Sequence, residues 1–149
     1  MRLYEQKLGI GNELTYLRFG MQVKKAVYDL YNFIKSEVEK GKIIYIYGAS
    51  TRGNTLLQTA KLDNTLIKAA VERNPDKWGK KIASVDIPII SEEQARKEKP
   101  DYFLICPWFF KDEFIKREEE YIKSGGSLIF PLPKLEIVNA KNIDNYPIL

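Results

Sequence analysis

The stretch of this sequence best suited to chemistry is "YGASTRGN", which follows the apolar run "IIYIY". It fits neither of the two best-known phosphate fingerprints, because Asn54 stands where a Walker loop has its lysine and Ser50 replaces the middle glycine of G-x-G-x-x-G. Backbone N–H groups at a helix N-terminus, two hydroxyls and the guanidinium of Arg52 would still suit an anion. The alternative is a tight strand-to-helix turn capped by a serine or threonine. We therefore predict a ligand-binding loop made of Gly48, Ser50, Thr51, Arg52, Gly53 and Asn54.

A carboxylate follows the next predicted strand. Glu72 lies 24 residues after Gly48, at the predicted end of the second strand. Dinucleotide-binding folds place there the acid that binds a pair of ribose hydroxyls. Glu72 is accordingly predicted either to contact a sugar hydroxyl or to form a surface ion pair with Arg73.

Two more loops follow predicted strands and complete the candidate site. The segment "NPDKWGKK" is basic and holds one aromatic residue, so it grips a phosphate, stacks on a base, or is simply a solvated loop. In "CPWFF", a proline ends the fourth predicted strand where a crevice should open, and the aromatic residues either line that crevice or pack in the core. The residues predicted to bind ligand from these loops are Asn74, Lys77, Lys80, Pro107 and Trp108.

Missing residue types narrow the possible chemistry. The chain has no histidine and one cysteine, which excludes Ser-His-Asp and Cys-His catalysis and nearly every transition-metal site. Acid–base catalysis would have to use Asp, Glu, Lys or Tyr. We therefore predict no metal site and no catalytic residue in this chain. Cys106 lies in an apolar run and implies no disulfide, which fits a cytoplasmic protein.

Composition is that of an ordinary globular domain. The 149 residues are 44% hydrophobic and 30% charged, and the net charge of +4 is mixed with acidic residues along the chain. That mixture argues against a nucleic-acid-binding surface but suits a small anionic ligand. No apolar run approaches the roughly 20 residues of a membrane span, and "MRLYEQKLGIGNELT" does not resemble a signal peptide. We expect no nucleic acid and no membrane among the partners.

Alternating strands and helices must position these loops. Apolar residues at helical spacing predict a long helix over residues 14–40, and the spacing of Tyr16, Tyr28 and Tyr31 on it predicts that these side chains pack. Five segments then read as strands, "KIIYIYGAS", "LIKAAVER", "PII", "DYFLICP" and "SLIFPLP", with "KLEIV" as a sixth. Helices between them predict a doubly wound parallel sheet of five to six strands. The expected organisation is one domain, residues 1–149, with an α/β core over 42–138 and a C-terminal tail over 139–149.

Four ordered blocks together resemble a known family. "YGASTRGNTLLQ", "VERNPDKWGKKI", "IPIISEEQ" and "PDYFLICPWFFKDEFIKREEEYIKSGGSLIFPLPKLEIV" are similar to the C-terminal domain of sugar C-methyltransferases. Those enzymes methylate nucleotide-linked deoxysugars, typically dTDP-sugars, with S-adenosylmethionine as methyl donor. The resemblance runs from the long first helix to about Val138 and implies a Rossmann-like domain that closes over the nucleotide-sugar.

The resemblance also implies a division of labour. A complete enzyme of that family carries a cysteine-rich zinc domain and a methyltransferase domain, with its own cofactor loop and catalytic His and Glu residues, ahead of this part. The sequence lacks all of these features, so S-adenosylmethionine is expected in a catalytic domain or subunit and no cofactor in this chain. We expect a non-catalytic nucleotide-sugar-binding domain, either cut out or encoded separately from its partner. The alternative is a free-standing, NAD-type oxidoreductase-like domain, against which the missing middle glycine counts.

Overall fold

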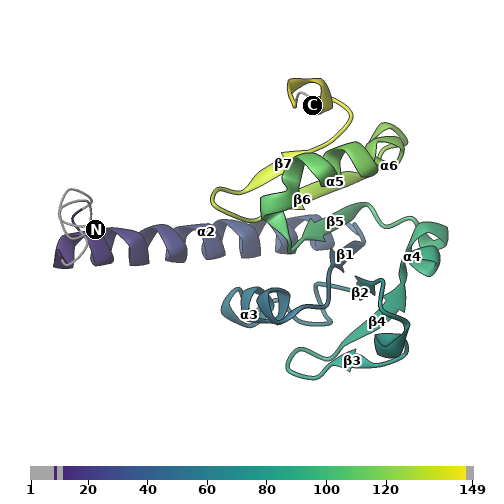
Figure 1. Ribbon diagram of the computed structural model, residues 1–149, viewed down its shortest axis with the longest axis horizontal. Coiled ribbons are helices and arrows are strands. Elements are labelled where there is room, and N and C mark those ends of the chain that lie inside the picture. Colours follow the sequence, from purple (N-terminus) through teal and green to yellow (C-terminus); the bar gives the residue numbers. More distant parts are fainter. Residues whose placement is uncertain (1–8, 10–11, 147–149) are drawn as a thin grey trace.

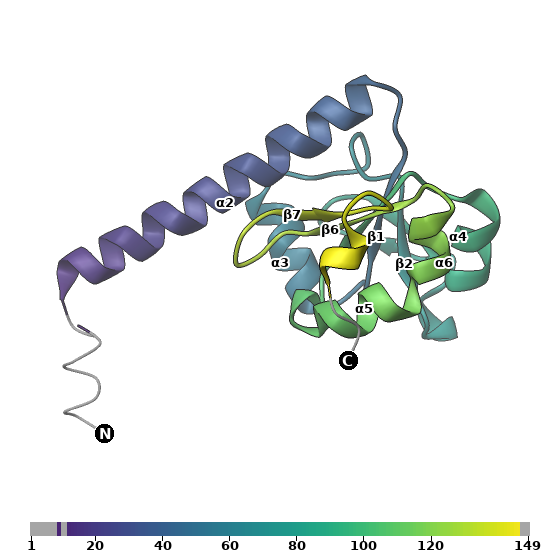
Figure 2. The same cartoon turned by 90° about the horizontal axis from the view of Figure 1, so that it is seen from above.

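The chain folds into a central sheet between two layers of helices, with one long helix that projects from the body (Figures 1 and 2). The computed structural model describes residue 9 and residues 12–146. Most of the N-terminal stretch that was compared with signal peptides therefore lies outside the described residues. The end of the predicted tail, 147–149, lies outside them as well.

The sheet has seven strands in the order β3-β4-β2-β1-β5-β6-β7. The five strands from β4 to β6 in this order are parallel, and β3 and β7 pair antiparallel at the two edges. Counted along the chain, the parallel strands have the order 3-2-1-4-5 of a doubly wound dinucleotide-binding fold, which confirms the predicted fold class. The strands are β1 (Ile44–Tyr47), β2 (Ala69–Glu72), β3 (Lys81–Ile82), β4 (Ile87–Ser91), β5 (Tyr102–Ile105), β6 (Ser127–Phe130) and β7 (Glu136–Val138).

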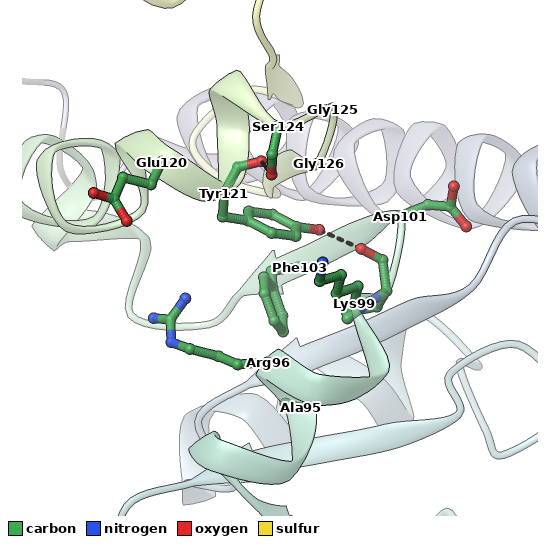
Figure 3. Close-up of a pocket in the computed structure, with 11 residues that line it drawn as sticks. Ala95, Arg96, Lys99, Asp101, Phe103, Glu120, Tyr121, Ser124, Gly125 and Gly126 are labelled. Carbon is green, nitrogen blue, oxygen red and sulfur yellow. Dashed lines mark hydrogen bonds between the residues drawn. The ribbon is translucent and has the colours of Figure 1, made fainter.

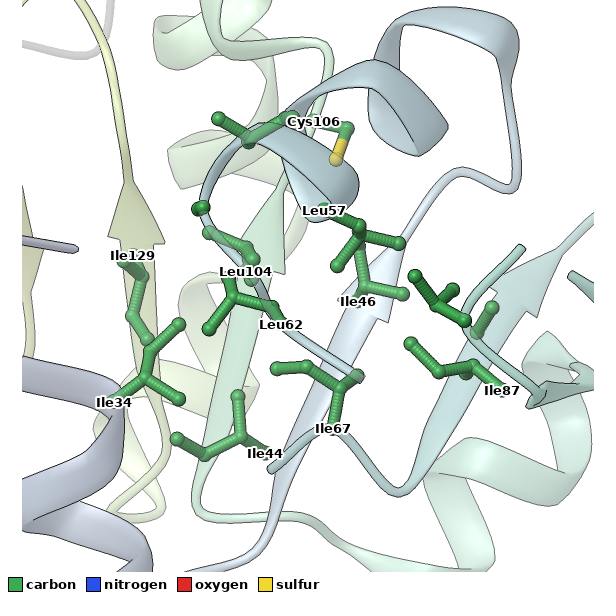
Figure 4. Packing of buried hydrophobic residues seen from close by; sticks show 14 of the residues in the cluster. Ile34, Ile44, Ile46, Leu57, Leu62, Ile67, Ile87, Leu104, Cys106 and Ile129 are labelled. Atoms are coloured by element: carbon green, nitrogen blue, oxygen red, sulfur yellow. The ribbon is translucent and has the colours of Figure 1, made fainter. Parts of the chain in front are cut away.

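Side chains alternate between two cores because successive residues of a strand point to opposite faces. On β1, Ile44 and Ile46 belong to a cluster with residues of α2 and α3, part of which is drawn in Figure 4. Tyr45 and Tyr47 belong to a second cluster with residues of α4, α5 and α6. The helices are α2 (Glu13–Glu39), α3 (Thr51–Thr59), α4 (Glu92–Glu98), α5 (Lys111–Arg117) and α6 (Glu119–Lys123), with short 3-10 turns at Pro75–Lys77, Trp108–Phe110 and Ile143–Asn145.

Helix α2 has two different halves. In its C-terminal half, Leu30 and Ile34 are buried against the sheet, and Glu37 accepts a 2.7 Å hydrogen bond from the hydroxyl of Tyr102 on β5. The N-terminal half extends past the body (Figures 1 and 2). The prediction that the tyrosines of this helix pack is right for Tyr31, which lies against the core, and wrong for Tyr16 and Tyr28, which are 59% and 67% exposed.

Three further details differ from the sequence prediction. The sheet has seven strands rather than five to six, because the two-residue β3 lies in a segment read as a polar loop. The last predicted strand, "KLEIV", is present as β7 but runs antiparallel. The single helix predicted after the fourth strand is divided at Glu118, whose buried carboxylate pairs with Arg96 at 2.9 Å and Arg117 at 3.0 Å.

Candidate functional site

The candidate site lies at the carboxyl edge of the sheet, between β1 and β5. The chain leaves β1 toward β2 on one side and reaches β5 on the other only after β4, so the strand order reverses between β1 and β5. Open α/β sheets bind their ligands in the crevice at such a point, because the loops on either side diverge. The two loops here are residues 48–50 and residues 106–110.

The first loop keeps two of the three glycine functions of a dinucleotide-binding turn. Gly48 has a φ of +96°, a left-handed conformation that favours glycine. Gly53 packs α3 closely on the sheet: a Cβ there would lie 2.9 Å from the carbonyl oxygen of Gly48 and 3.1 Å from Sγ of Cys106. Ser50 occupies the middle position and caps α3, its Oγ accepting a 3.2 Å hydrogen bond from the Gly53 N–H. The turn is therefore shaped like a phosphate cradle but has one N–H group already satisfied by its own side chain.

Arg52 and two aromatic side chains face each other across this crevice. The guanidinium carbon of Arg52 lies 5.0 Å from the ring centroid of Phe109, in cation–π geometry. Phe109 and Phe110 are about half exposed and their ring centroids are 5.0 Å apart. A cavity of about 380 Å³ is lined by Ser50, Thr51, Arg52, Cys106, Pro107, Phe109 and Phe110.

Phe109 and Phe110 were not among the predicted site residues. The sequence offered one signal for them, because Pro107 ends the strand, so the residues that follow it leave the sheet at the edge where ligands bind. Cys106 also lines this cavity, but it is almost completely buried, and burial raises the pKa of its thiol to about 12, which disfavours the reactive thiolate.

Glu72 is held by its own loop. Its carboxylate accepts hydrogen bonds from the backbone N–H groups of Arg73 at 2.9 Å and Asn74 at 3.3 Å, and from Nζ of Lys77 at 3.1 Å. Partial burial alone would raise the pKa of Glu72, but the hydrogen bonds from Lys77 and the two backbone groups outweigh it, and the pKa lies below its usual range. The predicted ion pair with Arg73 is not formed, since the guanidinium of Arg73 pairs with Glu92 instead.

Lys77 connects this second loop to the first one. Besides Glu72, its Nζ donates to the carbonyl oxygen of Ala49 at 3.1 Å, so two of the predicted loops do lie side by side. Asn74 caps the short turn that follows it by accepting from the N–H of Asp76 at 3.0 Å. The loop that was expected to grip a phosphate therefore uses Asn74 and Lys77 to fix its own shape.

The remaining predicted residues lie in other surroundings. Lys80 lines a separate cavity of about 280 Å³ between the β3 hairpin and α4. The side chain of Asn54 accepts from Gln58 and from Ser84, within and beside α3. Trp108 packs against both cores and lines an apolar groove of about 290 Å³ along α2 and α3, which Arg52 also borders.

A larger cavity, of about 510 Å³, lies between α4 and α6 and holds none of the predicted residues (Figure 3). Asp101 and Gly126, which line it, precede β5 and β6, so this cavity lies at the opposite, amino edge of the sheet. The Tyr121 hydroxyl donates to the carbonyl oxygen of Pro100 at 2.7 Å, and the ring leaves no room for a Cβ at residue 126. These contacts hold α6 against the loops that precede β5 and β6, which is a structural role.

Neither a metal site nor a membrane span is found in the part of the chain that the structure describes. No group of three or more His, Cys, Asp or Glu side chains is placed to hold a metal ion there. No helix within those residues is both long enough and apolar enough to cross a membrane.

Fold and site together define a Rossmann-like α/β domain with a modified phosphate-cradle turn at its switch point. The chain belongs to the family described as the C-methyltransferase C-terminal domain, which it matches over residues 1–133. It is 32% identical over 138 residues to the C-methyltransferase NovU of Streptomyces niveus, a match that covers 93% of this chain and 33% of that protein. The chain thus spans about a third of the length of this relative.

Among solved structures, a UDP-D-quinovosamine 4-dehydrogenase from Vibrio fischeri is similar, with a TM-score of 0.46 and 14% sequence identity. The match covers 68% of this chain and 97% of that chain.

Proposed function

We propose that this domain binds a nucleotide-sugar of the dTDP type and holds it for a sugar C-methyltransferase, whose chemistry is carried out by a separate domain or subunit. Membership of the C-methyltransferase C-terminal domain family supports this proposal. The observation that carries the ligand assignment is the crevice between β1 and β5, where a cradle-shaped turn, a cationic fork and two exposed rings come together.

Each part of the crevice suits one part of such a ligand. The N-terminus of α3 and the guanidinium of Arg52 favour the diphosphate, because both present donors and positive charge to an anion. The exposed faces of Phe109 and Phe110 offer an apolar platform for the base or the sugar ring. Lys77 fixes the loop beside Ala49, so the cradle is pre-organised before the ligand arrives.

The same geometry argues against NAD in its usual pose. The middle glycine of the fingerprint lets the backbone approach a pyrophosphate, and Ser50 replaces it here. We expect no S-adenosylmethionine in this chain either, and assign that cofactor to the catalytic domain of the complete enzyme.

A panel of ligands tests the proposal. Thermal shift and calorimetry would compare dTDP and a dTDP-sugar with NAD, NADP and S-adenosylmethionine. We expect the first two to raise the melting temperature, with binding that weakens as salt is added because phosphate is the contact. A shift with NAD or NADP and none with dTDP would overturn the assignment in favour of the oxidoreductase-like alternative.

A further inference from the structure

The outer half of α2 presents an uncovered apolar surface. Seven of the eleven large hydrophobic side chains that are exposed among the described residues lie on this one helix. Residues 14–23 supply six of them, with exposures from 37% to 70%, on a stretch that extends beyond the body in both views (Figures 1 and 2). Large contiguous apolar surfaces of this kind mark contact sites in proteins, because exposed apolar area is costly in water.

Two residues of this surface, Tyr16 and Val23, belong to a line of positions that is buried farther along the helix. Tyr16, Gly20, Val23, Val27, Leu30 and Ile34 follow one another at alternating intervals of four and three residues, the spacing of one helix face. The last three contact the core, and Leu30 and Ile34 are almost completely buried. The same face therefore loses its cover where the α/β body ends.

A groove joins this face to the candidate site. It has a volume of about 290 Å³ and runs between α2 and α3, where Val23, Val27 and Leu56 line it. Arg52, from the first turn of α3, and Trp108, from the second loop of the crevice, line it as well. A partner seated along the outer half of α2 would thus reach the edge of the crevice.

We propose that residues 14–23 of α2, with this groove, form the docking surface for the methyltransferase part of the enzyme, equivalent to the two thirds of NovU that this chain does not match. This inference rests on the proposed function and adds to it the surface through which the two parts meet. A methyltransferase part seated there would lie beside Arg52 and cover the bound nucleotide-sugar.

Two observations favour this occupant. The family is named as the C-terminal domain of a longer protein, so in relatives such as NovU the remaining part precedes the match and joins it at the end where α2 lies. The exposed apolar residues also span an arc of roughly 220° around the helix, at 3.6 residues per turn. A single helix from a second copy would cover only a narrow stripe of that arc, whereas a domain can enclose it.

Hydrogen exchange of α2 tests the docking surface. The first sample is this chain alone, and the second is a chimera in which it replaces the matched third of NovU. In the chain alone the outer half lacks tertiary cover, so its amides should exchange quickly. In the chimera we expect residues 13–26 to exchange at least tenfold more slowly.

Variants then test whether the exposed apolar residues of 14–23 are the ones that become protected. The double change Leu17→Glu with Met21→Glu should abolish the protection, whereas Gln22→Glu, on the polar side of the same helix, should keep it. Equal exchange in chain and chimera, or protection that survives the double change, would overturn the proposal. Hydrogen exchange of the chain can also be measured with the preceding part of NovU added as a separate polypeptide. This second measurement of protection does not depend on the fusion.

Two further results separate this inference from others. Protection that appears in the chain alone and rises with its concentration would replace the proposed partner by a second copy of the chain. Binding of dTDP by the chain alone is measured independently, and the double change should leave it unchanged. Failure of dTDP binding therefore counts against the proposed function, while failure of protection counts against the docking surface.

Discussion

At the scale of single residues, Arg52 is the side chain on which ligand binding should depend most. It borders both the crevice and the groove, and its stacking on Phe109 holds the guanidinium near the N-terminus of α3. A charge-assisted hydrogen bond to phosphate is worth about 1.5–3 kcal/mol, so Arg52→Ala should weaken dTDP or dTDP-sugar binding roughly ten- to a hundredfold. Arg52→Lys should recover part of the loss, because it keeps the charge without the planar fork. Unchanged affinity by calorimetry would assign Arg52 to structure or to a domain interface.

Glu72 is predicted to act mainly through the shape of its loop. Its pKa is lower in the folded chain than in the unfolded one, so its ionised form stabilises the fold above the unfolded pKa, and this contribution is lost as the pH falls through the folded pKa. Glu72→Gln should therefore lower the free energy of unfolding by about 0.5–1 kcal/mol at pH 7, since its partner Lys77 is partly exposed.

The pH dependence provides the check for Glu72. Urea unfolding at pH 7 and near pH 3 should show the difference between the two proteins at neutral pH and little of it in acid. We expect affinity for a dTDP-sugar to fall by no more than about tenfold, or about 1.4 kcal/mol. A larger loss of affinity with unchanged stability would return Glu72 to direct contact with a sugar hydroxyl.

Residue types alone predicted part of this site and missed the rest for a physical reason. The turn at Gly48 and Gly53 could be predicted, because the need for glycine there comes from local backbone geometry. The hydrogen-bond partners of Glu72 and Asn74 could not be predicted. Several acceptors compete for the same few donors, and only the folded loop decides between them. Phe109 was missed because an aromatic side chain after a strand suits either core or surface until the neighbouring Arg52 is placed.

At the scale of elements, the joint between α3 and the sheet allows no side chain at Gly53. A Cβ at 2.9 Å from a backbone oxygen forces the helix to move, so Gly53→Ala should destabilise the chain by about 1–3 kcal/mol. Gly20→Ala is the matched control, because a Cβ there meets nothing within 4 Å and alanine is the better helix former. Thermal or denaturant unfolding would measure both, and equal stability of Gly53→Ala and the parent chain would contradict the close packing.

The two halves of α2 should respond differently to the same change. Leu30 is 1% exposed, so Leu30→Ala should cost about 2–5 kcal/mol of unfolding free energy through lost burial and a cavity. Leu17 is 55% exposed, so Leu17→Ala in the chain alone should change stability by less than about 0.5 kcal/mol. A comparable loss for both variants would mean that the outer half is covered in the isolated chain.

Element prediction succeeded where a pattern is long and failed where it is short. Four of the five parallel strands are apolar runs buried on both faces, whereas β4 alternates buried and partly buried residues, and all five were predicted. The two-residue β3 carries too few residues for any periodicity, and the direction of β7 depends on pairing with β6 rather than on its own residues. Tyr16 and Tyr28 were expected to pack because helical spacing shows that residues share a face but not whether anything covers it.

At the scale of the whole molecule, the composition of the crevice lining bears on the proposed ligand. The described residues that line the crevice supply hydroxyls, one guanidinium and apolar rings, and no carboxylate. Such a lining suits the anionic ligand proposed above, and its place at the switch point is where we propose that a second domain closes over it. Under the proposed function, the catalytic groups belong to a part equivalent to the two thirds of NovU that this chain does not match.

The chain alone should therefore bind no S-adenosylmethionine and transfer no methyl group. This cofactor carries a sulfonium and an ammonium, and the crevice offers those cations the positive charge of Arg52 and no acidic partner within its lining. Calorimetry should show no heat with S-adenosylmethionine under conditions in which dTDP binds, and a labelled methyl group should not appear on a dTDP-sugar incubated with the chain. Micromolar binding of S-adenosylmethionine would show that this domain contributes to the catalytic site itself. It would overturn the assignment of the cofactor to a separate catalytic part.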